Sequence, residues 1–341
     1  MTLTVTYNNC CNDVTMTRNE PCCEVKAQIN ETEACCSPTE QRSEGEPCCA
    51  AAEDAEEGEA CCTPGEPGCC TSDELESSSE GIKEQVRKKY AAVATSGDGC
   101  GCGCGDGCGC ADETSFIGDA YDGAEGYQED ADLQLGCGIP TEVADLQEGH
   151  DVLDLGSGAG IDVFIARKSV GDSGTVTGLD FTPEMVELAR KNADQFGYQN
   201  VRFLEGDIES MPFEDRSFDR IISNCVINLV PDKRRAFSEI FRVLRDGGSF
   251  AISDIVLEGE LPPAIQNSAE MYAGCVSGAI TKTEYLQVVS NLGFTDVQIR
   301  RERVIELSDE DLRGVASSDE IAVFRASQAA ILSITLSGTR P

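Results

Sequence analysis

The sequence predicts a doubly wound α/β domain with a mostly parallel sheet, which begins near residue 141 and follows a long cysteine-rich segment. Short apolar runs alternate with amphipathic stretches from about residue 143 onward, and this alternation is typical of strands and helices that build a parallel sheet with both faces covered. A glycine-rich turn directly follows the first apolar run, at residues 156–160. Sheets that bind nucleotides carry such a turn between the first strand and the first helix.

The expected elements follow one another in a regular order. We expect strands at 150–155, 175–179, 201–204, 218–223 and 249–254, and helices that start at 161 and span 183–196 and 232–244. A short amphipathic helix precedes them at 82–93, and the chain ends with a helix near 282–292 and strands near 297–299 and 330–336. This order predicts a Rossmann-like sheet with a C-terminal α+β extension that completes it.

The first 80 residues differ from the rest in composition. They contain 18 Asp and Glu against 3 Lys and Arg, and no Phe or Trp, so they offer little apolar surface to offset the entropy of ordering. We expect four segments: a disordered acidic tail (1–80), a helix with a Cys/Gly-rich loop (81–140), the Rossmann-like nucleotide-binding domain (141–256) and the extension (257–341).

The charge of the chain argues against two classes of partner. The formal net charge is −36 at pH 7, whereas nucleic acids and anionic membranes are bound by basic patches. An acidic surface on a folded domain suits a salt-rich cytoplasm, where screening weakens self-repulsion, so we expect a halophilic source. The first twelve residues do not resemble a signal peptide and no apolar run is long enough to span a bilayer, which predicts a cytoplasmic protein.

The 20 cysteines fall into three groups. Six adjacent pairs lie in the tail, at 10–11, 22–23, 35–36, 48–49, 61–62 and 69–70. Five more alternate with glycine and aspartate: Cys100, Cys102, Cys104, Cys108 and Cys110. Cys137, Cys225 and Cys275 stand alone in the globular part. Because a reducing cytoplasm disfavours disulfides, the thiols indicate metal or redox chemistry.

The glycine-rich turn predicts a nucleoside site. Asp154, Gly156, Ser157 and Gly158 end the first strand and open a helix, where glycines permit close approach and the helix N-terminus offers free N–H groups. A dinucleotide fingerprint would need glycine at position 161, where Ile161 stands. The spacing instead resembles motif I of class I methyltransferases, which implies S-adenosylmethionine as cofactor.

Two further carboxylates fit the same site. Asp180 ends the next strand, 22 residues beyond Gly158, where it can accept both ribose hydroxyls. Asp207 and Ile208 follow the third strand and are expected to take the adenine amino group and to pack on the ring. Alternatively, Asp207 only caps a turn.

Taken one at a time, Cys225 and Cys275 would be read as small buried hydrophobes. In combination with other motifs they are more specific: Gly136-Cys137-Gly138, Leu153 to Gly158, Asp180-Phe181-Thr182-Pro183-Glu184-Met185, the Asn224-Cys225 segment and the Cys275 segment. Together these closely resemble the arsenite S-adenosylmethionine methyltransferase family over residues 81–341.

The resemblance implies site residues on both sides of the reaction. Cys225 and Cys275 would bind trivalent arsenic, with Cys102 representing the five glycine-loop cysteines, among which the choice stays open. Asn224 would line the methyl end of the cofactor, and Phe181 and Met185 belong to the cofactor motif. Cys69 or Cys70 would match the redox-active upstream cysteine of the family. A disulfide would form during turnover and be reduced by thioredoxin or a small thiol.

Elementary chemistry is consistent with that function. Soft thiolates select soft ions, and arsenic from arsenite or its thiol conjugates, held by three sulfurs, keeps a lone pair that can attack a sulfonium methyl. No general base is needed, which fits a chain whose one histidine, His150, opens the first strand at the end away from the site.

Two other functions remain open. One is a carbon or oxygen methyltransferase for a quinone-like small molecule, in which the cysteines are incidental. The other is a soft-metal sequestering protein that uses the cysteine-rich tail, although adjacent pairs and Cys-x-Cys spacings fit zinc and iron–sulfur sites poorly. Capture and delivery of the metalloid is our hypothesis for the tail.

Overall fold

The computed structural model describes residues 5–6, 15–16, 79–96, 121, 123–261, 278–307, 312, 316–327 and 329–341. The chain divides into two compact units, 1–82 and 83–341. In the first, strands β1 (Val5–Thr6) and β2 (Thr15–Met16) pair antiparallel. The predicted disordered tail, its cysteine pairs and the five cysteines at 100–110 otherwise lie outside the described residues.

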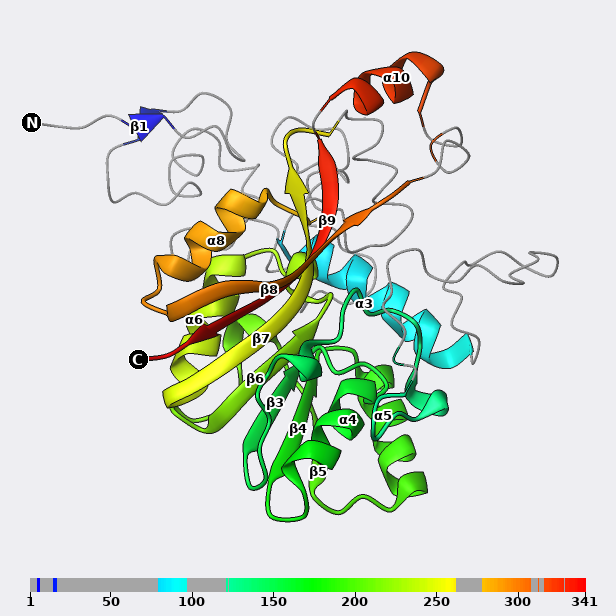
Figure 1. Cartoon of the computed structure of the whole chain (residues 1–341), viewed down its shortest axis with the longest axis vertical. Coiled ribbons are helices and arrows are strands. Elements are labelled where there is room, and N and C mark those ends of the chain that lie inside the picture. The colour runs from blue at the N-terminus through cyan, green and yellow to red at the C-terminus, as the bar shows by residue number, and fades with distance from the viewer. Residues whose placement is uncertain are drawn as a thin grey trace, which may run out of the picture. The chain divides into compact units, whose positions relative to one another are not determined.

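The second unit is built on a seven-stranded sheet of order β5-β4-β3-β6-β7-β9-β8. The strands are β3 (Asp151–Leu155), β4 (Thr175–Asp180), β5 (Val201–Glu205), β6 (Phe218–Asn224), β7 (Leu244–Glu258), β8 (Thr295–Ile305) and β9 (Ala330–Thr339). Strands β3 to β7 are parallel, and β9 lies antiparallel between β7 and β8. The predicted doubly wound, mostly parallel sheet is confirmed, and the C-terminal strands complete it (Figure 1).

Helices cover both faces of this sheet (Figure 1). On one face lie α4 (Ile161–Val170) and α5 (Pro183–Phe196), and on the other α6 (Lys233–Val243) and α8 (Lys282–Ser290). Two further helices are α3 (Ser79–Ser96) and α10 (Ser318–Ala326), and α10 packs in a third apolar cluster through Ile321 and Phe324. Successive residues of β3 point to opposite faces, so Val152 packs in the apolar cluster of α4 and α5. Leu153 packs in the other cluster, with Phe237 of α6 and Tyr285 of α8.

Two departures from the expected elements have clear local reasons. Strand β7 spans 15 residues and so begins before the expected residue 249, because its pairing with β6 starts at Leu244. The pairing then continues past an irregularity that contains Gly247, whose φ is +79°. Helix α10 was not predicted, although Ser317 and Glu320 form a capping box at its start, a pattern that sequence alone can reveal. None of the described helices combines the length and the apolar character that a membrane span requires.

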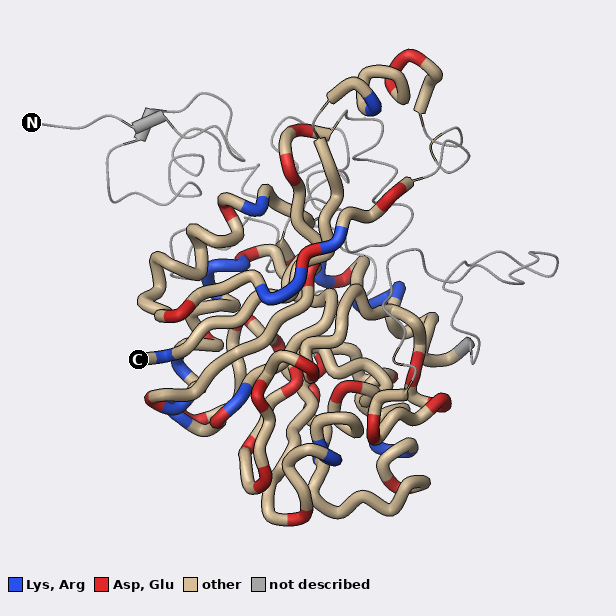
Figure 2. The backbone as a smooth tube through the Cα atoms, viewed as in Figure 1, with Lys and Arg blue, Asp and Glu red and all other residues tan. Residues whose placement is uncertain are grey.

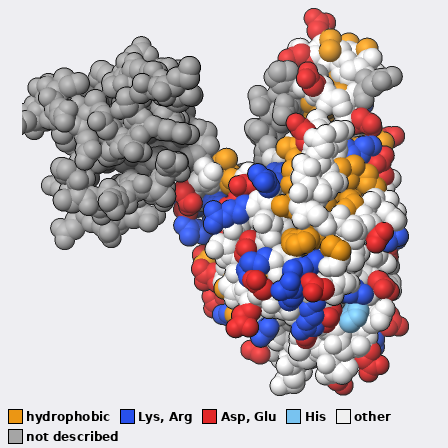
Figure 3. All heavy atoms as spheres, turned by 90° about the vertical axis from the view of Figure 1, so that its left-hand side faces the viewer, with side chains coloured by type: hydrophobic (Ala, Val, Ile, Leu, Met, Phe, Trp, Pro, Cys, Tyr) orange, Lys and Arg blue, Asp and Glu red, His pale blue; other side chains and the backbone are white. Residues whose placement is uncertain are grey.

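Charged residues of both signs are mixed over the second unit (Figure 2). Arginines on the surface pair with nearby carboxylates, as in Arg216 with Asp246 and Arg242 with Asp215. On the face drawn in Figure 3, basic side chains likewise lie among acidic ones. Such pairs are solvated and contribute little to stability.

The order of the strands determines where a ligand can bind. From β3 the chain proceeds outward to β4 and β5 on one side, and β6 and β7 lie on the other. In open α/β sheets, the crevice at the carboxyl ends of the strands where this reversal occurs is the usual ligand site.

Candidate functional site

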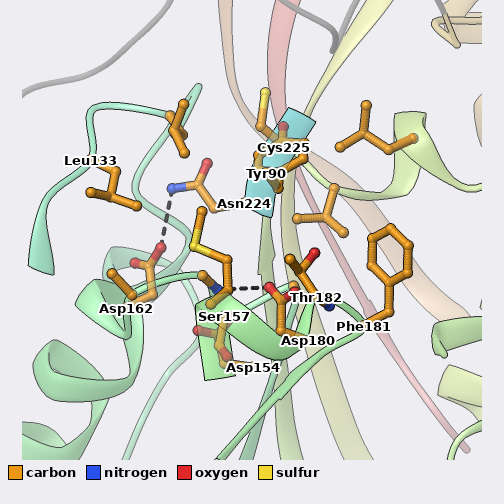
Figure 4. Close-up of a pocket in the computed structure, with 18 of the residues that line it drawn as sticks. Tyr90, Leu133, Asp154, Ser157, Asp162, Asp180, Phe181, Thr182, Asn224 and Cys225 are labelled. Carbon is orange, nitrogen blue, oxygen red and sulfur yellow. Dashed lines mark hydrogen bonds between the residues drawn. The ribbon is translucent and has the colours of Figure 1, made fainter. Parts of the chain in front are cut away.

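A pocket of about 1040 Å³, including open solvent, lies at that reversal, above the carboxyl ends of β3, β4 and β6. All ten residues that the sequence assigns to the cofactor line it: Asp154, Gly156, Ser157, Gly158, Asp180, Phe181, Met185, Asp207, Ile208 and Asn224. Cys225 lines the same pocket. Figure 4 shows Asp154, Ser157 and Asp180 on one wall, and Asn224 and Cys225 on the other.

The turn between β3 and α4 forms the floor of the pocket. Gly156 has φ +67°, and a Cβ there would collide with the side chain of Val226. Gly158 also has positive φ, +50°, but a Cβ on it would meet no atom within 4 Å. Glycine at 156 is therefore required by packing, whereas glycine at 158 leaves open space for a ligand beside the backbone.

Asp180 is fixed to this turn by backbone donors. Its Oδ2 accepts a hydrogen bond from the Gly158 N–H at 2.9 Å, and its Oδ1 accepts one from the Thr182 N–H at 2.9 Å. Burial raises the pKa of Asp180 above its ordinary value, and these hydrogen bonds oppose that effect. The carboxylate is thus preoriented at the end of β4.

Asp207 plays the capping role that the sequence left open as an alternative, and it also lines the pocket. Its Oδ1 accepts from the Glu209 N–H at 2.8 Å at the start of the short 3-10 helix η4 (Ile208–Ser210). Its Oδ2 accepts from Lys83 Nζ at 2.6 Å, and Lys83 pairs with Glu209 as well.

Helix α3 contributes a wall that sequence reasoning missed. Lys83, Val86 and Tyr90 line the pocket. The two neighbouring carboxylates keep the pKa of Lys83 above its ordinary value even though burial lowers it. The amphipathic pattern of the sequence predicts this helix, but the pattern does not predict which cavity the helix lines.

A second acid, Asp162, lies beside Asp154 in the pocket wall and was also missed. Burial raises the pKa of Asp162 to about 6, and it raises that of Asp154 well above its ordinary value, reinforced by the charges of Asp162 and Asp180. Oδ1 of Asp162 is buried without a hydrogen-bond partner. The signal that could have identified it is an acid in the first turn of a helix whose first six residues are otherwise apolar.

Asn224, the last residue of β6, ties the two walls together. Its Nδ2 lies 2.7 Å from the Gly138 carbonyl oxygen and 3.1 Å from Asp162 Oδ2, and its Oδ1 accepts from the Cys137 N–H at 3.0 Å. A Cβ on Gly136 would approach Asn224 Nδ2 to 2.6 Å. The Gly-Cys-Gly segment therefore packs directly on the end of β6.

This packing places Cys137 next to Cys225. Sγ of Cys137, Sγ of Cys225 and a carboxylate oxygen of Asp254 all lie within 4.8 Å of one another, and all three residues are buried. Cys225 has φ +61°, a strained left-handed conformation that non-glycine residues seldom adopt and that is often found at functional sites. The Cys137 carbonyl oxygen accepts from Ser333 Oγ of β9 at 2.5 Å, so the C-terminal strand also holds this segment.

Cys137 and Asp254 are functional candidates that the sequence did not assign. The Gly-Cys-Gly segment was noticed as a motif, but nothing in the spacing predicts that it meets Cys225. The other expected thiols, Cys275, Cys102, Cys69 and Cys70, lie outside the described residues.

Asp254 is held in place within β7. Its Oδ2 accepts from Tyr285 Oη at 3.0 Å, and its Oδ1 from the Ile255 N–H at 3.2 Å. Burial raises its pKa to about 7, moderated by the charge of Lys233 and by the hydrogen bond from Tyr285. Burial lowers the pKa of Lys233, whose Nζ donates to the Asn228 carbonyl oxygen at 3.3 Å. His150, in contrast, directly precedes β3 at the end away from the pocket, where its Nδ1 accepts from the Gln147 N–H.

Residues 146–293 match the methyltransferase domain family. The chain is 43% identical over 231 residues to an arsenite methyltransferase of Halobacterium salinarum, covering 64% of this chain and 59% of that protein. It is 36% identical over 189 residues to an arsenite methyltransferase of Mus musculus, covering 53% of this chain and 50% of that protein. It thus spans between half and three fifths of the length of these curated relatives.

Among solved structures, the chain is similar to CrArsM, an arsenic(III) S-adenosylmethionine methyltransferase of Chlamydomonas reinhardtii. The sequence identity is 38% and the TM-score is 0.51, and the match covers 59% of this chain and 66% of that one. Together with the sheet order, this likeness gives the domain the class I methyltransferase fold.

Proposed function

We propose that this chain, whose residues 146–293 are a methyltransferase domain, transfers methyl groups from S-adenosylmethionine to trivalent arsenic held by cysteine thiolates. The observation that carries the proposal is a pair of buried thiols: Cys225, which follows β6 and lines the nucleoside pocket, and Cys137, which lies beside it. The likeness to proteins named arsenite methyltransferase supports it.

S-adenosylmethionine fits the residues that line the pocket. The open space beside Gly158 admits a ligand close to the backbone. Asp180 would accept the ribose hydroxyls, and Asp207 with Ile208 would meet the adenine. The cofactor is cationic at its sulfonium and ammonium groups, so the buried acids Asp154 and Asp162 suit its methionine end. When bound, it supplies an electrophilic methyl group.

For the substrate, we propose Cys225 and Cys137 as two of the three sulfur ligands and Cys275 as the third. Cys102 is the other candidate for the upstream thiol, but geometry within the described residues supports Cys137. The chain's part in the reaction is chiefly positioning. Asn224 holds the cysteine segment against the end of β6, so the lone pair of the arsenic would face the methyl end of the cofactor.

The partners of this function are proposals of the same kind. Arsenite or its thiol conjugates would be the arsenic source. Thioredoxin or a small thiol would reduce the cysteines after turnover, and Cys69 or Cys70 would take part in that redox step. We place the protein in the cytoplasm, where such reductants are available.

The test is product formation by the purified full chain in molar salt, with labelled S-adenosylmethionine, a thiol and arsenite. We expect methylated arsenic, separated by chromatography, and none when arsenite is omitted. A failure to form it under these conditions contradicts the proposal. Methylation of a quinone-like phenol that survives Cys225→Ser would instead support the small-molecule alternative.

A further inference from the structure

We propose that Cys137, Cys225 and Asp254 form a binding site for a divalent d¹⁰ cation, zinc or cadmium, which competes with arsenic for the two thiols. The competition rests on the proposed function, whereas the cation site itself does not. The three side chains come from the loop before the 3-10 helix η3 (Pro140–Glu142), from the residue after β6 and from β7.

The spacing of the three donors is close to what such an ion requires. Their ligand atoms lie within 4.8 Å of one another. Zinc bonds of about 2.0 to 2.3 Å place tetrahedral ligands roughly 3.5 Å apart, so small rotations of the side chains would close the site. Cys225 lines the pocket, which offers a route of entry and room for a fourth ligand.

The carboxylate is the feature that points to a divalent ion. Trivalent arsenic is satisfied by three sulfurs, whereas zinc and cadmium accept sulfur and oxygen together. Asp254 also has the outer support that is typical of a metal-binding carboxylate, because Tyr285 Oη and the Ile255 N–H hold its two oxygens. A carboxylate that only filled space would be costly to bury in this position.

Charge favours the same occupant. Two thiolates and a carboxylate carry three negative charges, so a dication leaves one, and the ammonium of Lys233 is near enough to act on Asp254. Binding would release the two thiol protons to solvent, and no electron transfer is involved. An occupied site would withhold both thiols from arsenic until a chelator or competing thiol removed the ion.

The test is protection of individual cysteines in the full, reduced and chelator-treated chain, with zinc alone as the probe. Alkylation by N-ethylmaleimide is continued long enough for these buried thiols to react through local opening of the fold. It is followed for the peptides of Cys137 and Cys225 by mass spectrometry, which separates them from the other 18 cysteines. We expect zinc to slow alkylation of both. Asp254→Asn should raise the zinc concentration that halves the alkylation rate at least about tenfold. The arsenite concentration that halves the same rate should change much less. Asp172→Asn, at an exposed site, is the matched control.

The cation site is overturned if zinc protects both cysteines equally well in Asp254→Asn, or protects only cysteines elsewhere in the chain. Should Asp254→Asn fail to fold by circular dichroism, Cys137→Ser replaces it, and loss of zinc protection at Cys225 is then the expected result. Unchanged protection at Cys225 would overturn the site. Arsenite methylation without zinc protection would remove only this inference, and zinc protection without methylation would remove only the proposed function.

Discussion

The cofactor wall of the pocket, which includes Asp180 and Asp207, and the cysteine cluster beside it hold their groups in different ways. This cluster, of which Cys225 lines the pocket, is called the cysteine wall below. On the cofactor wall, Asp180 accepts a hydrogen bond from the Thr182 N–H and Asp207 accepts one from the Glu209 N–H. Each donor is only two residues from its acceptor in sequence. On the cysteine wall, Cys137, Cys225 and Asp254 come from three distant segments and meet through Asn224 and β9. The first wall depends mainly on local structure, with Lys83 of α3 as its one long-range donor named above, and the second depends on long-range packing. Substitutions should therefore separate the two.

The largest effect is expected from Cys225→Ser, which removes a proposed arsenic ligand and leaves the cofactor wall intact. Arsenite methylation should fall at least about a hundredfold, because positioning of the nucleophile supplies much of the rate. Affinity for S-adenosylmethionine, measured by calorimetry, should stay within about twofold. Equal loss of both properties would mean that the two walls are not separable.

Asp180→Ala instead alters the cofactor wall and leaves the thiols intact. Loss of hydrogen bonds to a charged group costs about 1.5 to 3 kcal/mol, so S-adenosylmethionine affinity should fall roughly tenfold to a hundredfold. Protection of Cys225 by arsenite in the absence of cofactor should not change. If arsenite protection is lost as well, Asp180 supports the whole fold rather than one wall.

Asn224→Ala should affect both walls, since this side chain joins them. It removes the hydrogen bonds of Asn224 to the Cys137 N–H and the Gly138 carbonyl, and the free energy of unfolding should fall by about 1 to 3 kcal/mol. The free energy of unfolding is measured by denaturant titration in high salt. Gln195→Ala, which removes an exposed hydrogen bond to Asp130, is the control and should change stability much less.

The smallest effect is a pH dependence on the cofactor wall. Burial raises the pKa of Asp162 to about 6, so its side chain gains its charge as pH rises through 6 and then attracts a cationic cofactor. Affinity for S-adenosylmethionine should rise by roughly fivefold across that range, about 1 kcal/mol, and the rise should disappear in Asp162→Asn. The effect on folding is the opposite of the effect on cofactor binding. Because the pKa of Asp162 is raised in the folded chain, its contribution to the free energy of unfolding is lost as pH rises from about 4 to 6. If the affinity for S-adenosylmethionine still rises with pH in Asp162→Asn, the pH dependence belongs to another group.

The same contrast explains what the sequence could predict. The sheet, most of its helices and seven of the ten cofactor residues follow from periodicity and from motifs at strand ends, which are local. The other three, Phe181, Met185 and Asn224, are implied by the family resemblance. The contact of helix α3 with Asp207 joins residues 124 apart in sequence. Cys137 meets Cys225 and Asp254 because its segment packs on Asn224, 87 residues away. Sequence spacing gives no signal for either contact. The glycines at 136 and 138 matter because of what they touch, Asn224 and Ser253, and sequence alone does not reveal those neighbours.

The central claim is that the thiols beside the cofactor pocket hold the arsenic. A single-turnover experiment tests it directly: the full chain carries one equivalent of arsenite, labelled S-adenosylmethionine is added, and label on arsenic is counted. We predict that Cys137→Ser lowers this transfer at least about tenfold, since loss of a ligand disturbs the approach geometry, while Cys102→Ser leaves it near the wild-type value. Transfer that is abolished by Cys102→Ser and preserved in Cys137→Ser would contradict the account.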